Sequence, residues 1–206
     1  HFDLAPAVLE SVTGRSDVSP LASLVRRVNG VLEPDIRVRA IAMAAEGFDA
    51  RFSAIWRRYC YRIADHAGCR DPLTRGFVLH WPRNLDEALM NDAAEALLGE
   101  HDFAAFCKRR EGATTIRTLL DLEWERDQSG VLVGTVRADA FCHNMVRSLV
   151  GCLIAIGEGR KPVTWAAQIL EARARDSAVG VVAPHRLTLE EVAYPDDLDL
   201  AAQAQR

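Results

Sequence analysis

The 206-residue sequence lacks the features that mark membrane, secreted and metal-binding proteins. Its longest apolar run, residues 140–157, is interrupted by Arg147 and several polar residues, so it does not predict a membrane span. The N-terminus has no basic stretch followed by an apolar one, and no secretory signal is expected. The five cysteines form no CxxC pair, which argues against a zinc site and predicts reduced thiols in a cytoplasmic protein.

The sequence also has no general excess of basic residues, as its formal net charge of −4 shows. The charges are unevenly placed, however. Basic residues gather in residues 57–75 and 108–117, while residues 190–199 are acidic. A basic surface that binds an anionic partner can therefore exist on this acidic protein.

Hydrophobic periodicity predicts a mixture of helices and strands. Ser19 before Pro20 indicates a helix that ends at Gly30, and Asn84 is expected to cap a second helix that ends before Gly99. Further helices are expected over residues 141–156 and 162–176. Strands are expected over residues 35–42, 51–63 and 187–194, with a hairpin of residues 119–126 and 131–140. The elements do not alternate regularly, which favours an α+β fold with a largely antiparallel sheet.

The strand-like run RRYCYRI, residues 57–63, has no plainly apolar face. With a side-chain period of two, Arg57, Tyr59 and Tyr61 share one face and Arg58 and Arg62 share the other. Such a surface is suited to a charged or planar partner.

Arg147 is the only formal charge in the apolar helix expected over residues 141–156. Arginine keeps its proton when buried, so this position implies an anion close by. A structural ion pair, or a guanidinium that reaches solvent, explains it as well as an active-site role in holding a catalytic carboxylate or a phosphate. Gly151, one turn further on, would let another backbone come close.

The resemblance to a known family rests on several blocks of the sequence. In order these are HFDL, PDIRV, FDARFSAIWRRYCYRI, LDEALMNDAAEALLGEHDFAAF, TTIRT and AFCHNMVRSLVG. They resemble successive blocks of the tRNA pseudouridine synthase A family. The most specific feature is HDFxAF followed about 35 residues later by AFxxxMVRxxVG.

The resemblance implies a two-lobed pseudouridine synthase fold around one continuous, mostly antiparallel sheet. We expect residues 1–50 to be the remainder of an N-terminal catalytic lobe and residues 51–206 to be the C-terminal lobe. The family implies a homodimer without metal or cofactor, and no membrane partner. Its substrate is the anticodon arm of tRNA, in which the uridines at tRNA positions 38, 39 and 40 are isomerised to pseudouridine.

Site residues follow from the same blocks. The family's stacking tyrosine matches Tyr59, and the arginine that pairs with the catalytic aspartate matches Arg147. Phosphate contacts are expected from five basic residues, namely Arg57, Arg58, Lys108, Arg109 and Arg110. For Arg57 and Arg58 a solvated strand face is an equally good interpretation, and Tyr59 without the family blocks would be an ordinary half-buried tyrosine.

The family's nucleophilic aspartate lies in a GRTDAGVHA loop before the block that matches HFDL, and no such loop is present. The GRSD stretch at residues 14–17 follows HFDL, so Asp17 is interpreted as a loop residue. The aspartate is expected upstream of His1, and this fragment alone is expected to be inactive. A non-catalytic RNA-binding module with the same fold is the alternative. Two further departures are Asp49 where histidine is usual, and the stretch APHRLTLEEV, which lacks the glycine common before the family's last strand.

Overall fold

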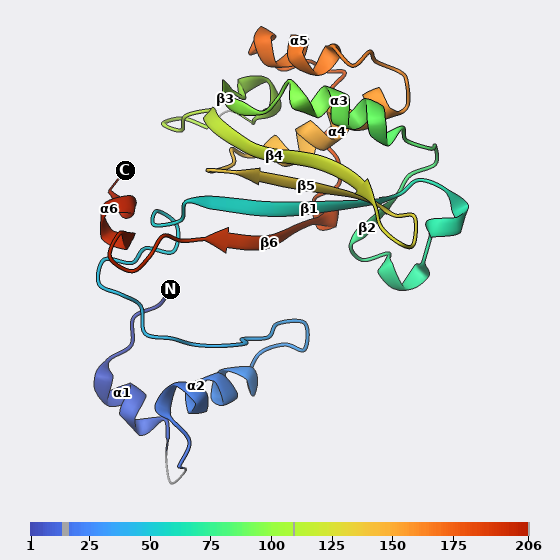
Figure 1. Ribbon diagram of the computed structural model, residues 1–206. Helices are drawn as coiled ribbons and strands as arrows, with labels where there is room; N and C mark the ends of the chain where they lie inside the picture. The colour runs from blue at the N-terminus through green and yellow to red at the C-terminus, as the bar shows by residue number, and fades with distance from the viewer. Residues whose placement is uncertain (14–16, 109, 206) are drawn as a thin grey trace. The chain divides into compact units, whose positions relative to one another are not determined.

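The computed structural model describes residues 1–13, 17–108 and 110–205, and the chain divides into two compact units (Figure 1). One unit contains His1–Ser53 and Pro195–Arg206, and the other contains Ala54–Tyr194. The lobes expected at residues 1–50 and 51–206 stay a prediction, because compactness alone does not define a catalytic lobe. Of the GRSD stretch, residues 14–16 lie outside the described residues.

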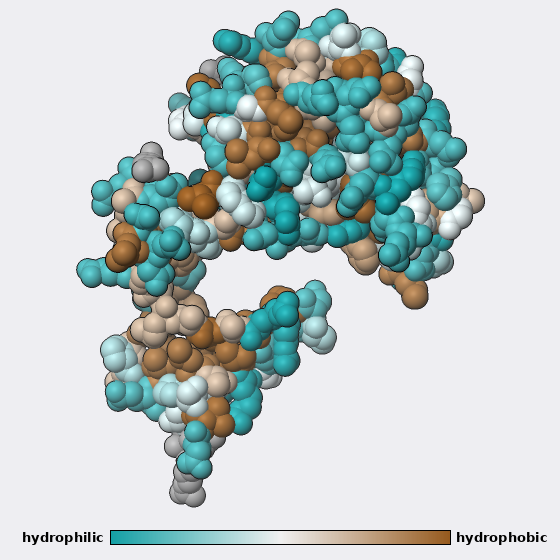
Figure 2. Space-filling view, viewed as in Figure 1, coloured by the Kyte–Doolittle hydropathy of each residue, from teal (hydrophilic) through white to brown (hydrophobic). Residues whose placement is uncertain are grey.

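The first unit contains three short helices, α1 (Pro6–Ser11), α2 (Pro20–Asn29) and α6 (Leu200–Ala204). The helix predicted after Ser19 is confirmed, because the Ser19 hydroxyl accepts a hydrogen bond from the Ala22 amide at 3.4 Å and Gly30 follows the last turn. The visible face of this unit carries many hydrophobic residues (Figure 2). They surround a cavity of about 540 Å³ whose lining includes Phe2, Met43 and Phe48.

The strand predicted over residues 35–42 is wrong, since this segment is extended but forms no ladder. Its alternation is that of a strand, yet the described part of the chain offers it no partner strand. The Asn29 side chain takes over one pairing instead. Its Nδ2 donates to the Val38 carbonyl at 2.8 Å and its Oδ1 accepts from the Val38 amide at 2.9 Å.

The second unit is built on a sheet with the order β2-β1-β5-β4-β3, with β6 also paired to β1. The strands are β1 (Trp56–Ala64), β2 (Val78–His80), β3 (Gly99–Asp102), β4 (Ile116–Arg126), β5 (Leu132–Ala138) and β6 (Leu187–Ala193). Only the β1–β2 pairing is parallel among the described strands. The α+β fold with a mostly antiparallel sheet is therefore confirmed.

The predicted hairpin is present as β4 and β5, with Arg126 opposite Leu132. Its turn is fixed by the Asp127 carboxylate, which accepts hydrogen bonds from the amides of Ser129 and Val131 at 2.8 and 3.0 Å. Gly130 completes the turn with a φ of 79°, a conformation that other residues adopt at a cost. Turn chemistry that can be read in the sequence thus sets the register of β4 against β5.

Helices α3 (Glu87–Glu95), α4 (Met145–Gly157) and α5 (Trp165–Ala172) cover one face of this sheet (Figure 1). Every residue of α4 except Arg147 is buried, as its continuous apolar pattern predicts. Gly151 lies against Gly180, and a Cβ at this position would fall 1.9 Å from the Gly180 carbonyl oxygen. The predicted close approach of another backbone is confirmed.

Two predicted helix starts are wrong by a few residues. Asp86, and not Asn84, caps α3, because its carboxylate accepts from the Leu89 amide at 3.1 Å. Helix α4 begins at Met145 instead of Phe141, since Asn144 adopts a left-handed φ of 70° that breaks the helical path. No helix in the described ranges is both long and apolar enough to cross a membrane.

Candidate active site

A cavity of about 350 Å³ opens where β1, the start of α4 and the start of β6 meet. This volume suits a single nucleoside better than an extended ligand. The cavity brings together residues that are far apart in the sequence. Its lining comprises Tyr59, Arg110, Phe141, Cys142, His143, Asn144, Met145, Val146, Arg147 and Leu187.

Tyr59 reaches this cavity from the middle of β1, where its neighbours across the sheet are Val136 and Leu189. Its ring is half-buried and meets the Phe141 ring edge to face, with centroids 5.1 Å apart and planes at 83°. This contact fixes the tilt of the tyrosine ring. Tyr59 therefore offers the cavity an aromatic surface in a defined orientation.

Arg147 enters the cavity from the first turn of α4. Its Nε donates to the Val182 carbonyl at 2.5 Å, and its Nη1 donates to the Asn144 side-chain oxygen at 3.1 Å. Within residues 1–13, 17–108 and 110–205, no carboxylate forms an ion pair with Arg147. Of the three interpretations that the sequence left open, a structural ion pair within the described residues is excluded, and a guanidinium that reaches solvent and an active-site role remain.

Tyr61 lies behind the cavity, buried between the sheet and α4. Its hydroxyl donates to the Ala183 carbonyl at 3.1 Å. Burial raises the pKa of this phenol to about 12, and the positive charges of Arg186 and Arg147 act in the opposite direction. Tyr61 therefore stays protonated near neutral pH.

The basic residues expected to contact phosphate are placed differently from one another. Arg110 lines the cavity, and Lys108 is tied to the α4 entrance by its amide, which donates to the His143 carbonyl at 2.8 Å. Arg57 donates from Nη1 to the Asp139 carbonyl at 2.6 Å. Arg109 lies outside the described residues.

Arg58 projects from the face of β1 opposite to Tyr59. It pairs there with Glu190 at 3.8 Å and with Glu191 at 3.0 Å. Both carboxylates come from β6, the neighbouring strand. This pairing favours a solvated strand face over a phosphate contact for Arg58, which had been an open alternative.

A disulfide joins Cys107 to Cys142, whose Cα atoms are 5.8 Å apart. The prediction that all cysteines are reduced is wrong for this pair, because the fold brings together two residues separated by 35 positions. The bond ties the segment that leads into Lys108 and Arg110 to the cavity wall.

Cys60, Cys69 and Cys152 are free and buried. Burial raises the pKa of Cys60 to about 11 and that of Cys152 to about 12, so neither Cys60 nor Cys152 is a nucleophile near neutral pH.

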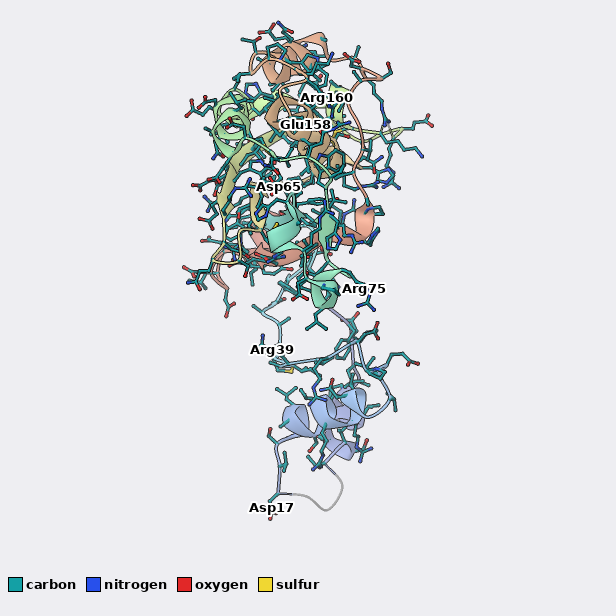
Figure 3. The ribbon with its side chains drawn as sticks, turned by 90° about the vertical axis from the view of Figure 1, so that its right-hand side faces the viewer. Asp17, Arg39, Asp65, Arg75, Glu158 and Arg160 are labelled. Carbon is teal, nitrogen blue, oxygen red and sulfur yellow. A yellow bond between two sulfur atoms is a disulfide. The ribbon has the colours of Figure 1, made fainter. Side chains whose placement is uncertain are left out.

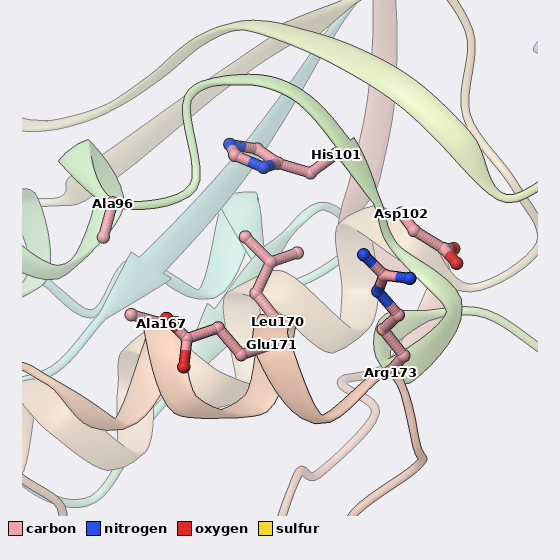
Figure 4. Close-up of a pocket in the computed structure, with 7 residues that line it drawn as sticks. All are labelled: Ala96, His101, Asp102, Ala167, Leu170, Glu171 and Arg173. Atoms are coloured by element: carbon pink, nitrogen blue, oxygen red, sulfur yellow. The ribbon is translucent and has the colours of Figure 1, made fainter.

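A second polar cavity, of about 380 Å³, lies between the β3 segment and α5 (Figure 4). Arg173 extends toward Asp102 in this view, and His101 lies on the other side of Leu170. Asp102 and His101 are already engaged in hydrogen bonds within the sheet unit. The Asp102 carboxylate accepts from the Ala104 amide and the Thr115 hydroxyl, and His101 Nε2 lies 2.8 Å from the Leu98 carbonyl oxygen. We interpret this cavity as a packing feature of the HDF turn.

One group of side chains in the described residues has atoms close enough to share a metal ion, namely Asp65, His66 and Cys69, with potential ligand atoms within 4.8 Å of one another. Both Asp65 oxygens, however, accept hydrogen bonds from Arg126, at 3.0 and 2.8 Å. The Leu85 amide adds a third bond at 2.8 Å. A metal would have to displace this cation, so the arrangement fits a structural ion pair better than a metal site.

Sequence reasoning missed two features of this site. The left-handed Asn144 holds the Arg147 guanidinium, and Arg186 approaches Tyr61. Positive φ at asparagine is common but not predictable from this sequence alone. No pattern in the sequence singled out Arg186, because its environment depends on the packing of the turn before β6.

Comparison with known proteins places these residues in a family context. A family model described as tRNA pseudouridine synthase matches residues 93–195. The chain is 59% identical over 182 residues to a Streptomyces griseus protein named tRNA pseudouridine synthase A. The matched residues cover 88% of this chain and 64% of that relative. A protein of the same name from Frankia casuarinae is 52% identical, and the match covers 97% of this chain and 79% of that relative. Another from Leifsonia xyli is 48% identical, and the match covers 100% of this chain and 74% of that relative. The chain thus spans only part of these relatives.

Proposed function

Because the chain belongs to the tRNA pseudouridine synthase family, we propose that the full-length protein isomerises uridine to pseudouridine in tRNA, and that the cavity at Tyr59 and Arg147 is its active site. We place the target uridines in the anticodon arm, at tRNA positions 38, 39 and 40. The observation that carries the proposal is an arginine directed into a nucleoside-sized cavity beside an aromatic ring, with no carboxylate partner in the described residues.

The reaction breaks the bond between the ribose C1′ and N1 of the base and forms a bond between C1′ and C5. The base gains a proton at N1 and loses one from C5, so the atoms balance without a cofactor. The base must leave its stack to reach the enzyme, turn, and be rejoined. A site for this chemistry needs a flat surface that holds the base through the turn and an anionic nucleophile.

Tyr59 supplies the flat surface. Its ring lies in the cavity at a tilt set by Phe141, which suits it to stack on an extruded uracil. Arg147 supplies the cation that a buried carboxylate nucleophile requires, since a guanidinium keeps such a carboxylate ionised and oriented. We propose that this carboxylate is the aspartate expected upstream of His1.

Lys108, Arg109 and Arg110 are proposed to contact the tRNA backbone next to the cavity. Lys108 and Arg110 are exposed, and Arg110 also lines the cavity. Phosphate contacts of this kind supply affinity and position but not sequence choice. Arg57 has the same proposed role, with part of its guanidinium already bonded to the Asp139 carbonyl. A homodimer in the cytoplasm is proposed from the family resemblance.

The proposal is tested by tritium release from tRNA labelled at uridine C5, using the full-length protein. We expect release from tRNAs that carry uridine at positions 38, 39 or 40, and none from a matched tRNA with cytidine at these positions. Binding of tRNA without any tritium release would overturn the enzymatic assignment and leave the alternative, a non-catalytic RNA-binding module. Sedimentation of the same sample tests the dimer.

A further inference from the structure

Arg186 is the last residue of the short 3-10 turn Pro184–Arg186, directly before β6. The next residue, Leu187, lies opposite Tyr61 in the β1–β6 ladder and lines the cavity that also contains Tyr59 and Arg147. The segment leading to this turn is bonded to the same site, because Val182 accepts from Arg147 and Ala183 accepts from Tyr61. Arg186 is therefore held at the border of the proposed active site.

The guanidinium of Arg186 is unusual in its lack of partners. Its Nε and Nη1 are buried, yet neither has a hydrogen-bond partner among the described residues. No described carboxylate pairs with it either. Buried donors without acceptors destabilise a fold, so the structure without ligand is incomplete at this point.

We propose that Arg186 binds a phosphodiester oxygen of the RNA, at the nucleotide next to the uridine held by Tyr59, and so positions the substrate. The inference rests on the proposed function, and it adds a contact that the sequence blocks did not assign. A planar guanidinium matches the geometry of a phosphate and remains charged at every relevant pH.

A phosphate is a better partner for Arg186 than the catalytic carboxylate. Arg147 is bonded to the cavity wall through Val182 and Asn144, and one guanidinium suffices to neutralise one carboxylate. Arg186 follows two exposed residues, Pro184 and His185, so its turn borders solvent, where a nucleic-acid backbone can approach. RNA brings one negative charge per nucleotide, which accounts for a second cation beside the first.

The experiment compares full-length wild type with Arg186→Met, Arg186→Lys and a control, Arg175→Ala, at an exposed arginine outside the cavity. Binding of an anticodon-arm RNA is measured across a salt series, together with tritium release at saturating RNA. We expect Arg186→Met to weaken binding about tenfold and to reduce the slope of log K against log salt by roughly 0.7 to 0.9, the value for one lost phosphate contact. Arg186→Lys should restore the slope, and Arg175→Ala should change neither.

The partner is identified with RNAs that carry one uncharged methylphosphonate linkage beside the target uridine. Wild type should bind more weakly when the methylphosphonate replaces the one phosphate that Arg186 contacts, and normally when it replaces another. Arg186→Met should bind the RNA with and without that methylphosphonate equally well, because the mutation and the methylphosphonate remove the same contact. Thermal melts without RNA separate this role from a structural one. Arg186→Met should melt no lower than wild type, because it removes unsatisfied donors and keeps the side-chain volume.

Each remaining outcome overturns the inference. An unchanged salt slope in Arg186→Met, with tritium release lost at saturating RNA, would assign Arg186 to the nucleophile instead. A lowered melting temperature with normal binding would make it structural. In both cases tritium release by the wild type would still support the proposed function. If the wild type released no tritium, the proposed function itself would be contradicted.

Discussion

Two sets of arginines in the 54–194 unit differ in what neutralises them. Arg126 forms a two-pronged ion pair with Asp65, and Glu158 accepts from Trp81, Arg83 and Arg160. Asp65, Glu158 and Arg160 are labelled in Figure 3. Around the cavity, by contrast, Arg147 and Arg186 have no carboxylate partner among the described residues.

The difference separates stability from function. Asp65 and Glu158 are almost fully buried, with side chains 0% and 1% exposed, so their arginines balance charges that folding has already removed from water. At the cavity the proposed partners differ, because Arg147 would meet the protein's own upstream aspartate, and only Arg186 would be in place before its anion, an RNA phosphate. Preorganised charge of this kind costs stability in the free protein and is recovered when an anionic ligand binds.

The largest expected effect is at Arg147. In the full-length protein, Arg147→Ala should abolish pseudouridine formation, because the nucleophilic carboxylate would lose the cation that keeps it ionised and aimed. The same change should lower the free energy of unfolding by roughly 3 to 5 kcal/mol, since the carboxylate would be buried without a partner. Tritium release and a denaturant melt measure the two effects.

Arg147→Lys serves as the matched control. It keeps the charge but loses the planar fork that bonds Val182 and Asn144, so we expect a folded protein with little activity. An Arg147→Ala protein that is both stable and active would remove Arg147 from the active site.

The sequence predicted Arg147 better than its surroundings, and the reason is physical. A single charge in a buried helix can be recognised from the order of residues alone, and so can the cap of α2 and the β4–β5 turn. The partner of a charged side chain depends on how the chain folds and cannot be recognised from neighbouring residues in the sequence. The Asp65–Arg126 pair spans 61 positions and the Cys107–Cys142 bond spans 35, so no local pattern announces either.

The failed strand at residues 35–42 has the same origin. Its alternating side chains fit a strand, but a strand also needs a neighbour, and here only the Asn29 side chain offers a pairing. Conversely, the left-handed Asn144 shortened a helix whose apolar pattern continued past it. Local patterns set propensities, and the availability of partners decides between them.

The second prediction tests the paired group. Arg126→Ala should destabilise the protein by roughly 3 to 5 kcal/mol, because Asp65 would stay buried and charged without its partner. Asp65→Asn should cost less, since the Arg126 side chain is 31% exposed and can be solvated by water. Urea melts compare the two variants. Neither should change tRNA binding per folded molecule, and a loss of binding in folded Arg126→Ala would contradict the separation of the two groups.

The pH dependence of the same pair gives a third test. Burial by itself raises the pKa of Asp65, but the hydrogen bonds from Arg126 and the Leu85 amide outweigh it and hold the pKa below the usual 3.8. A lowered folded pKa contributes stability that is fully present above the unfolded pKa and is lost as pH falls through the folded one. The stability difference between wild type and Asp65→Asn should therefore be constant above about pH 5 and shrink below pH 4. A difference that grows on acidification would contradict this assignment.

A smaller effect is expected at Tyr59, where the contact to substrate is uncharged. Tyr59→Ala should weaken RNA binding by about 1 to 3 kcal/mol, the usual range for one stacked base, whereas Tyr59→Phe should bind normally because the ring supplies the stacking. The variants are compared by binding of an anticodon-arm RNA and by tritium release. Normal binding by Tyr59→Phe with lost turnover would give the hydroxyl a chemical role, such as moving the C5 proton.

The smallest effect per residue is expected in the basic loop formed by residues 108–110, and it tests whether the positive charge of this loop serves RNA binding. Replacing Lys108, Arg109 and Arg110 by Ala should flatten the salt dependence of tRNA binding by roughly two to three units, at roughly 0.7 to 0.9 per phosphate. Arg58→Ala is the matched control, because Arg58 is already paired with Glu190 and Glu191 on the opposite face of the sheet. If the control flattened the slope as much as the loop variant, exposure alone would govern the contacts, and the pairing of a cation would not predict its role.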